Sequence, residues 1–365
     1  MAFPSPKRGL LLILSVKYFI IDFIIRNDYT PDVMVNISKE ESSALNALRL
    51  CCVLSVVMIH SSLNIPDIAS VIGESDIKIT SIWHHIYCLL PSLQLLFLIS
   101  GYLFFRGIHD QYNWKRDYIK KIQGRYVGLF LFYIVYCILG LVFGIVVKHD
   151  PIPSFSGFLQ GFWPLDPMQH PMGRGMWYIR SLIAFTFLSP IYYIVIKHLR
   201  HFCIPAFMVL SECPLPIDFT YFNCWLFLGA YLAYSGITLS SIAQHFDWRI
   251  TLPLAIAVHV VTKFWHLPCP FLLEELLFLV GCIGFFSHVR ISPILTASST
   301  FIYAFHFFIT GAAKHLYFRL LPHETWAYNL NMLLTWATAV LLCFLLFLVI
   351  RRFKYLPILL MGGRG

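Results

Sequence analysis

Charged side chains are scarce in this 365-residue sequence. Asp, Glu, Lys and Arg make up 12% of the chain, hydrophobic residues make up 58%, and the mean hydropathy is +0.72. A soluble domain is about a quarter charged and about half apolar, so this composition excludes a single soluble core and indicates a polytopic protein of the lipid bilayer. Acidic residues are the scarcer kind, 18 against 27 basic ones. In a membrane protein such a surplus places Lys and Arg on the cytoplasmic side, so we expect no nucleic-acid partner.

Cysteine patterns that bind metals are also lacking. The ten cysteines include no Cys-x-x-Cys pair. Most of them lie within apolar runs, where cysteine behaves as a small buried hydrophobic residue. The sequence therefore predicts neither a metal site nor a disulfide framework.

Apolar runs of membrane length begin at residue 44. We expect spans near 44–64, 86–106, 126–147, 176–197, 219–236, 249–266, 270–288, 300–320 and 329–350, and a weaker one near 202–217. Basic residues cluster after the second and the last spans, so both of these segments should be cytoplasmic. That requires an even number of spans between them, which the weak span supplies. We predict an all-α bundle of about ten spans with both termini in the cytoplasm.

Three parts of the chain follow from these spans. Residues 1–43 form an N-terminal segment whose apolar stretch, 9–25, lacks a signal-peptide cleavage site. This stretch is an interfacial helix, an extra span or an extension. Residues 44–352 form the transmembrane domain, and residues 353–365 form a short cytoplasmic tail.

The first span carries two ionisable side chains. Arg49 lies near its expected cytoplasmic end and His60 towards its outer end. The intervening distance is close to three helical turns, roughly 16 Å, which places both side chains on one face. Ionisable residues inside a bilayer are costly and are kept mainly where they function. The pair indicates a site that runs through the membrane. The alternative is an Arg that snorkels to the headgroups and a His bonded to a neighbouring helix.

The second and fourth spans add further candidates. Ser100 and Gly101 lie at the end of 86–106, where Ser100 can bond a ligand and Gly101 permits close backbone approach. Helix packing through small residues explains them equally well. Trp177 and Arg180 open the span 176–197 near the outer face. Arg180 either binds a ligand there or snorkels to the interface.

Two late spans contain ionisable residues as well. Glu274 and Glu275 project about 100° apart on a helix, so at most one can face a site, and either could pair with Arg180. Tyr303 and His306 lie in the span 300–320. One lone His on an apolar face is usually a satisfied core residue, but two on different helices, with an Arg, favour a polar cavity.

These motifs, in this order, resemble the integral-membrane acyltransferases of the acyltransferase-3 type. The resemblance covers roughly residues 44–352, and ten spans is also the usual number in that family. The basic segment departs from the family pattern, because Lys121-x-x-x-Arg125-Tyr126 replaces an Arg-x-x-Arg followed by Pro-Tyr. The matching features are the Arg49-to-His60 spacing, Phe-Leu-Ile-Ser-Gly-Tyr-Leu at 97–103, the basic segment 115–125, Trp-Tyr-Ile-Arg-Ser-Leu at 177–182 (Trp-Phe-Leu-Arg-x-Leu in the family), Gly-Ala-Tyr-Leu at 229–232, and Ile-Tyr-x-x-His at 302–306.

The resemblance implies an O-acyltransferase of the bacterial inner membrane that modifies cell-envelope polysaccharide. The acyl donor would be cytoplasmic acetyl-CoA, the acceptor a carbohydrate hydroxyl, and no metal would take part. His60 would act as a general base or a transient acyl carrier, and Arg49 would hold a donor phosphate or carbonyl. The residues expected to attract the CoA phosphates are Lys115, Arg116, Lys120, Lys121 and Arg125. The possible additional site residues are Ser100, Gly101, Trp177, Arg180, Tyr303 and His306.

Two other functions use the same residue types. A transporter or flippase for a lipid-linked glycan could use the intramembrane Arg and His as a proton or anion path. Transporters often contain two related halves, and the sequence has no clear internal repeat. A membrane-bound O-acyltransferase of the unrelated type also needs an intramembrane His, but it would not predict the Ser-Gly-Tyr run or the Arg-to-His spacing.

Overall fold

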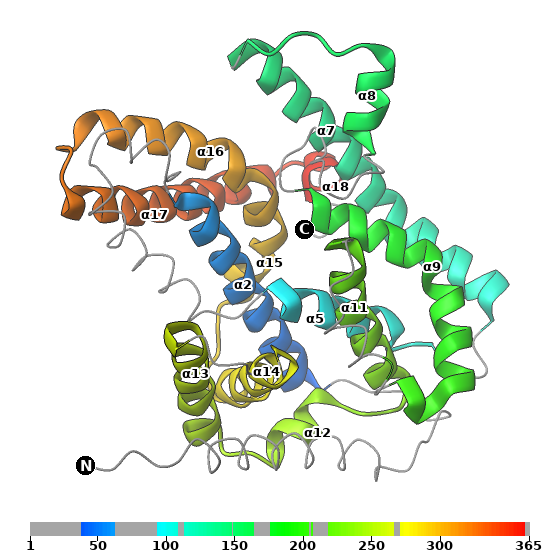
Figure 1. Ribbon diagram of the computed structural model, residues 1–365. Coiled ribbons are helices and arrows are strands. Elements are labelled where there is room, and N and C mark those ends of the chain that lie inside the picture. Colours follow the sequence, from blue (N-terminus) through cyan, green and yellow to red (C-terminus); the bar gives the residue numbers. More distant parts are fainter. Residues whose placement is uncertain are drawn as a thin grey trace, which may run out of the picture.

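The computed structural model (Figure 1) describes residues 38–62, 93–108, 113–147, 149–163, 176–203, 206, 218–265 and 271–361. This part of the chain consists of helices joined by turns and contains no strand. The all-α fold predicted from the sequence is confirmed.

Nine helices form the main body of the described residues: α2 (Lys39–Ser61), α5 (Leu93–Phe105), α7 (Val127–Val147), α9 (Trp177–Leu199), α11 (Asp218–Tyr234), α13 (Trp248–Trp265), α14 (Phe271–His288), α16 (Ser299–Leu320) and α17 (Thr325–Ile350). Shorter α-helices connect or flank them: α6 (Ile119–Lys121), α8 (Phe155–Phe162), α12 (Leu239–Gln244), α15 (Pro293–Ala297) and α18 (Leu356–Met361). Two π-helical segments, η2 (Trp114–Tyr118) and η3 (Ile122–Tyr126), flank α6, and a 3₁₀ turn, η4 (Arg200–Phe202), follows α9.

Within the described residues, four helices are long and apolar enough to cross a membrane: Lys39–Ser61, Val127–Val146, Trp177–Leu199 and Trp326–Ile350. Shorter apolar helices cover Leu93–Phe105, Cys224–Tyr234 and Trp248–Val261. Each of these falls on an expected span, and α14 and α16 occupy the two that remain. The weak span at 202–217 lies almost wholly outside the described residues, as does the stretch 9–25. The total of ten spans therefore stays a prediction.

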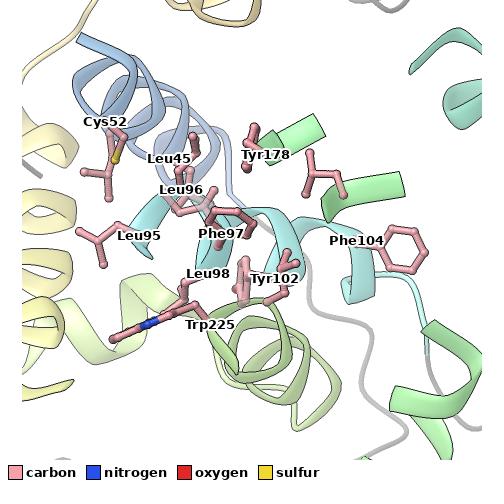
Figure 2. Close-up of a cluster of buried hydrophobic side chains, with 14 of the residues drawn as sticks. Leu45, Cys52, Leu95, Leu96, Phe97, Leu98, Tyr102, Phe104, Tyr178 and Trp225 are labelled. Atoms are coloured by element: carbon pink, nitrogen blue, oxygen red, sulfur yellow. The ribbon is translucent and has the colours of Figure 1, made fainter. Parts of the chain in front are cut away.

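Helix α5 lies at the centre of the fold. Figure 1 shows it between α2 and α11, and it packs against both of them and against α14. Its side chains at 95–99 are buried. Figure 2 shows them among Leu45 of α2, Trp225 of α11 and Tyr178 of α9. The Phe-Leu-Ile-Ser-Gly-Tyr-Leu run at 97–103 therefore lies largely within the hydrophobic core of the described protein.

Two glycines allow α5 and α11 to cross closely. A Cβ atom on Gly101 would lie 2.8 Å from the carbonyl carbon of Leu226, and one on Gly229 would lie 2.9 Å from that of Leu98. Both distances are shorter than real Cβ contacts, and the obstacle in each case is backbone, which has little freedom to move. The Ser-Gly-Tyr and Gly-Ala-Tyr runs therefore meet at this crossing, as small residues do between membrane helices.

Helix α2 is tied to the rest of the fold through a buried carboxylate. Its N-cap is Ser38, whose Oγ accepts from the backbone N–H of Glu41 at 3.0 Å, as in the first half of a capping box. The carboxylate of Glu41, only 3% exposed, accepts from the Tyr102 hydroxyl at 3.2 Å and from the backbone N–H of Leu239 at 3.1 Å. It also accepts from the N–H and hydroxyl of Ser240. One side chain thereby joins α2, α5 and the first turn of α12.

Candidate functional site

The two histidines predicted for the site lie side by side. His60 is in the last turn of α2 and His306 is on α16, and these two helices pack against each other. Their ring centroids are 5.2 Å apart and the ring planes are inclined by 34°. His60 is half-buried, whereas His306 is 0% exposed. The structure thus brings together two residues that are 246 positions apart in the sequence.

The hydrogen bond of His306 determines which ring nitrogen is basic. Nδ1 lies 3.1 Å from the carbonyl oxygen of Ile302. A carbonyl only accepts, so Nδ1 carries the hydrogen and Nε2 keeps a lone pair. Among the described residues, Nε2 has no hydrogen-bond partner. Buried polar atoms without partners are rare, so the lone pair of Nε2 is an available hydrogen-bond acceptor beside a second imidazole.

A line of polar and aromatic contacts extends from the histidine pair towards α5. Tyr303 lies one turn before His306, with ring centroids 6.1 Å apart, and the Tyr178 ring meets Tyr303 edge-on at 5.2 Å. The hydroxyl of Tyr178 is 2.6 Å from Oγ of Ser100. The structure therefore groups Ser100, Tyr303, His306 and His60, all of them predicted, through Tyr178. Sequence reasoning did not name Tyr178 as a site residue, although the hydroxyl it carries in place of the family's Phe was a signal.

Two other predicted residues lie in the helix packing beside this line. Trp177 is half-buried and its ring contacts Phe97 at 5.7 Å. Gly101 faces the backbone of Leu226 at the crossing with α11. The visible role of both is to pack α9 and α11 against α5.

The two predicted arginines have different surroundings. Arg49 and His60 are half-buried on a helix whose other side chains are mostly buried, which fits their placement on one face. Within the described part of the chain, Arg49 forms no hydrogen bond or ion pair. Arg180, 7% exposed, is instead buried on α9. Its side chain is two residues from Tyr178 and so projects from another side of α9.

The two carboxylates that were possible partners of Arg180, Glu274 and Glu275, are both buried. Glu274 forms a buried carboxylate–imidazole contact with His259 of α13, a residue that sequence reasoning missed. Helices α13 and α14 are consecutive and pack as a hairpin, and consecutive elements are usually neighbours in space. Glu275, also buried, lies near Cys52 of α2.

The basic segment between α5 and α7 consists of η2, α6 and η3. Tyr118 anchors it to α9 by donating to the carbonyl of Thr186 at 2.8 Å. Lys115, Arg116 and Lys120 are exposed. Lys121 donates to the carbonyl of Phe104, and its Nζ lies 4.2 Å from the centroid of the Phe104 ring. Lys121 therefore caps the C-terminal end of α5.

Charge within this segment is partly neutralised. The guanidinium of Arg116 forms an ion pair with Asp117 at 2.9 Å, and this hydrogen-bonded contact lowers the pKa of the Asp117 carboxyl below its usual value. Among the described side chains of this segment, Lys115 and Lys120 are therefore the exposed cations without a carboxylate partner. The side chain of Arg125 lies outside the described residues.

No group of three His, Cys, Asp or Glu side chains within the described ranges could hold a metal ion. The described site offers two imidazoles, several hydroxyls and the guanidinium of Arg49. These groups can move protons and stabilise developing negative charge.

Comparison with protein families gives one match, to the acyltransferase-3 family model, described as an acyltransferase domain, over residues 42–352. Comparison with curated proteins and with solved structures gave no match. The matched range contains every residue of the histidine pair, the aromatic line and the basic segment. The chain therefore belongs to the acyltransferase-3 family and is an integral-membrane acyltransferase.

Proposed function

We propose that this enzyme transfers an acetyl group from cytoplasmic acetyl-CoA to a hydroxyl of a cell-surface or lipid-linked carbohydrate in the inner membrane of a bacterium. The observation that carries the proposal is the pair of His60 and His306. The identities of donor and acceptor come from the family resemblance. Family membership also favours this reaction over glycan transport.

The reaction forms a C–O bond to the acceptor and breaks the C–S bond of the thioester. The acceptor hydroxyl loses its proton and the CoA thiolate gains one, so a basic group has to hold the proton between the two events. Imidazole titrates near neutrality. Half-buried His60 can reach the acceptor and take its proton as the oxygen attacks, or it can carry the acyl group transiently. Buried His306 lies beside His60, and its Nε2 has no hydrogen-bond partner in the described structure. In this proposal His306 assists His60 in holding the proton.

Donor binding is assigned to the positively charged groups without a strong protein partner. Exposed Lys115 and Lys120 would attract the CoA phosphates. Arg49, on the same face of α2 as His60, would hold a phosphate or the thioester carbonyl. Arg116 and Lys121 contribute less in this proposal, because Asp117 and the Phe104 carbonyl already engage them.

The test uses membranes that contain equal amounts of wild-type protein or of a variant, supplied with acetyl-labelled acetyl-CoA and several glycan acceptors. Release of the label by mild base identifies an O-ester. We expect His60→Ala to lower the rate by about 10²–10⁴-fold, which is the usual contribution of a general base. The matched control is His315→Ala, because His315 is an exposed histidine on α16.

Three outcomes are informative. Labelled glycan from the wild type and the control, but not from His60→Ala, supports acetyl transfer with His60 in the chemistry. Equal labelling by His60→Ala would remove His60 from the mechanism. Absence of label from folded wild-type protein with every acceptor would reject acetyl transfer to carbohydrate and leave transport as the next hypothesis.

A further inference from the structure

The hydroxyl of Tyr178 forms a hydrogen bond with Ser100 whose direction the geometry defines. Ser100 Oγ lies 2.8 Å from the carbonyl of Leu96 and 2.6 Å from the hydroxyl of Tyr178. A carbonyl only accepts and a serine hydroxyl has one hydrogen, so Ser100 donates to Leu96. Ser100 must then accept from Tyr178. This bond fixes the orientation of the Tyr178 side chain relative to α5.

The ring of Tyr178 is also held from two sides. Phe97 of α5 meets it edge-on at 4.9 Å, and Tyr303 of α16 meets it at 5.2 Å and 69°. Tyr178 and Tyr303 are both buried, so neither ring can turn without displacing its neighbours. The contact between the Tyr178 and Tyr303 rings therefore links the positions of α5 and α9 to the position of the first turns of α16.

Tyr303 in turn lies beside His306. The two rings are on one face of α16, with centroids 6.1 Å apart. The bond to Ile302 sets the rotation of the imidazole, but Ile302 moves with α16 and cannot set the distance between α16 and α2. That distance determines where Nε2 of His306 lies relative to His60. The direct packing of α16 on α2 sets that distance, and the ring of Tyr178 adds a contact to α16 from α9.

We propose that Tyr178 is a positioning residue for the histidine pair, acting through Tyr303 on His306. The bond to Ser100 anchors it on α5, whose side chains at 95–99 are buried in the core. The inference rests on the proposed acyl transfer, because it concerns the pair that would perform it. Phe occupies this position in the run that the sequence resembles, so the hydroxyl anchor is a feature of this chain.

The test is Tyr178→Phe, which removes one oxygen and keeps the ring. We expect kcat to fall roughly tenfold, about what the loss of one hydrogen bond near a reacting group gives, with KM for acetyl-CoA unchanged. Ser100→Ala should reproduce the effect. The matched control is Tyr136→Phe, because Tyr136 is buried and its hydroxyl has no partner among the described residues.

A double-substitution cycle separates positioning from a general loss of stability. If Tyr178 acts through His306, then Tyr178→Phe should have no further effect in a His306→Ala background. A loss that multiplies with that of His306→Ala, or a Tyr178→Phe rate equal to that of the wild type, would overturn the inference.

A second measurement is independent of activity. In protein labelled with ¹⁵N-histidine, the ring nitrogens of His306 should show the Nδ1–H tautomer and should shift in Tyr178→Phe but not in Tyr136→Phe. Unchanged His306 signals in Tyr178→Phe would reject the positioning role even if no acyl transfer were found. An inactive wild type with shifted signals would reject the proposed reaction alone.

Discussion

Substitution of Gly101 by Ala tests the packing of the central helix. The added Cβ would lie 2.8 Å from the carbonyl carbon of Leu226 and closer still to its oxygen. Optimal carbon–carbon contact is about 3.5–4.0 Å, so α5 and α11 would have to separate by roughly 1 Å. Overpacking of this kind destabilises by about 1–3 kcal/mol. We expect the loss of stability to reach or exceed the upper end of this range, because the obstacle is backbone. Gly229 of α11 also packs against the backbone of α5 in the same way.

The matched control is Gly311→Ala. Gly311 lies inside α16 and a Cβ there meets nothing within 4 Å, so Ala should stabilise the helix by up to about 1 kcal/mol through its propensity. Thermal unfolding of both variants in detergent would measure the difference. A Gly101→Ala protein at least as stable as Gly311→Ala would refute the close crossing of α5 and α11.

Three further predictions concern charged residues. Removal of one partner of the buried pair, by His259→Leu or Glu274→Leu, should lower the free energy of unfolding by about 3–5 kcal/mol. The double variant should lose less than the sum of the two single losses. Thermal unfolding measures these losses, and additive losses would argue against the pair. Glu41→Gln should destabilise by about 1.5–3 kcal/mol, because a neutral amide replaces a carboxylate that accepts several hydrogen bonds, and a wild-type unfolding temperature would contradict this. Combined Lys115→Ala and Lys120→Ala should raise KM for acetyl-CoA several-fold at low salt and much less at high salt; a salt-independent change would exclude electrostatic attraction of the donor.

The helices and several site residues could be predicted from the sequence because they depend on local pattern. Apolar runs of membrane length mark the spans, and a His in such a run is conspicuous, so His60 and His306 could be chosen as candidates from the sequence. Their contact was not, because it depends on how α16 crosses α2. Helix length and composition leave tilt and rotation undetermined.

Other contacts show the same limit. Gly101 was compatible with packing or with a ligand, and only the nearby backbone of Leu226 shows its packing role. The sequence left open whether Glu274 or Glu275 pairs with Arg180, and it did not indicate the contact of Glu274 with His259 on the neighbouring helix α13. Tyr178 lies within an aromatic run and did not stand out. Its bond to Ser100 depends on how far α5 and α9 are shifted along their axes relative to each other, and the periodicity of the sequence does not determine that shift.

His60 and His306 are proposed to act as one catalytic unit, and a double-substitution cycle on acetyl transfer tests this proposal. Purified wild type, His60→Ala, His306→Ala and the double variant would be compared at saturating acetyl-CoA and acceptor, after unfolding temperatures confirm that each is folded. Residues that act as a unit give strongly non-additive losses. We expect each single variant to lose about 10²–10⁴-fold in rate and the double variant to be no slower than the slower single one. Wild-type rates in either single variant, or losses that multiply in the double variant, would contradict it.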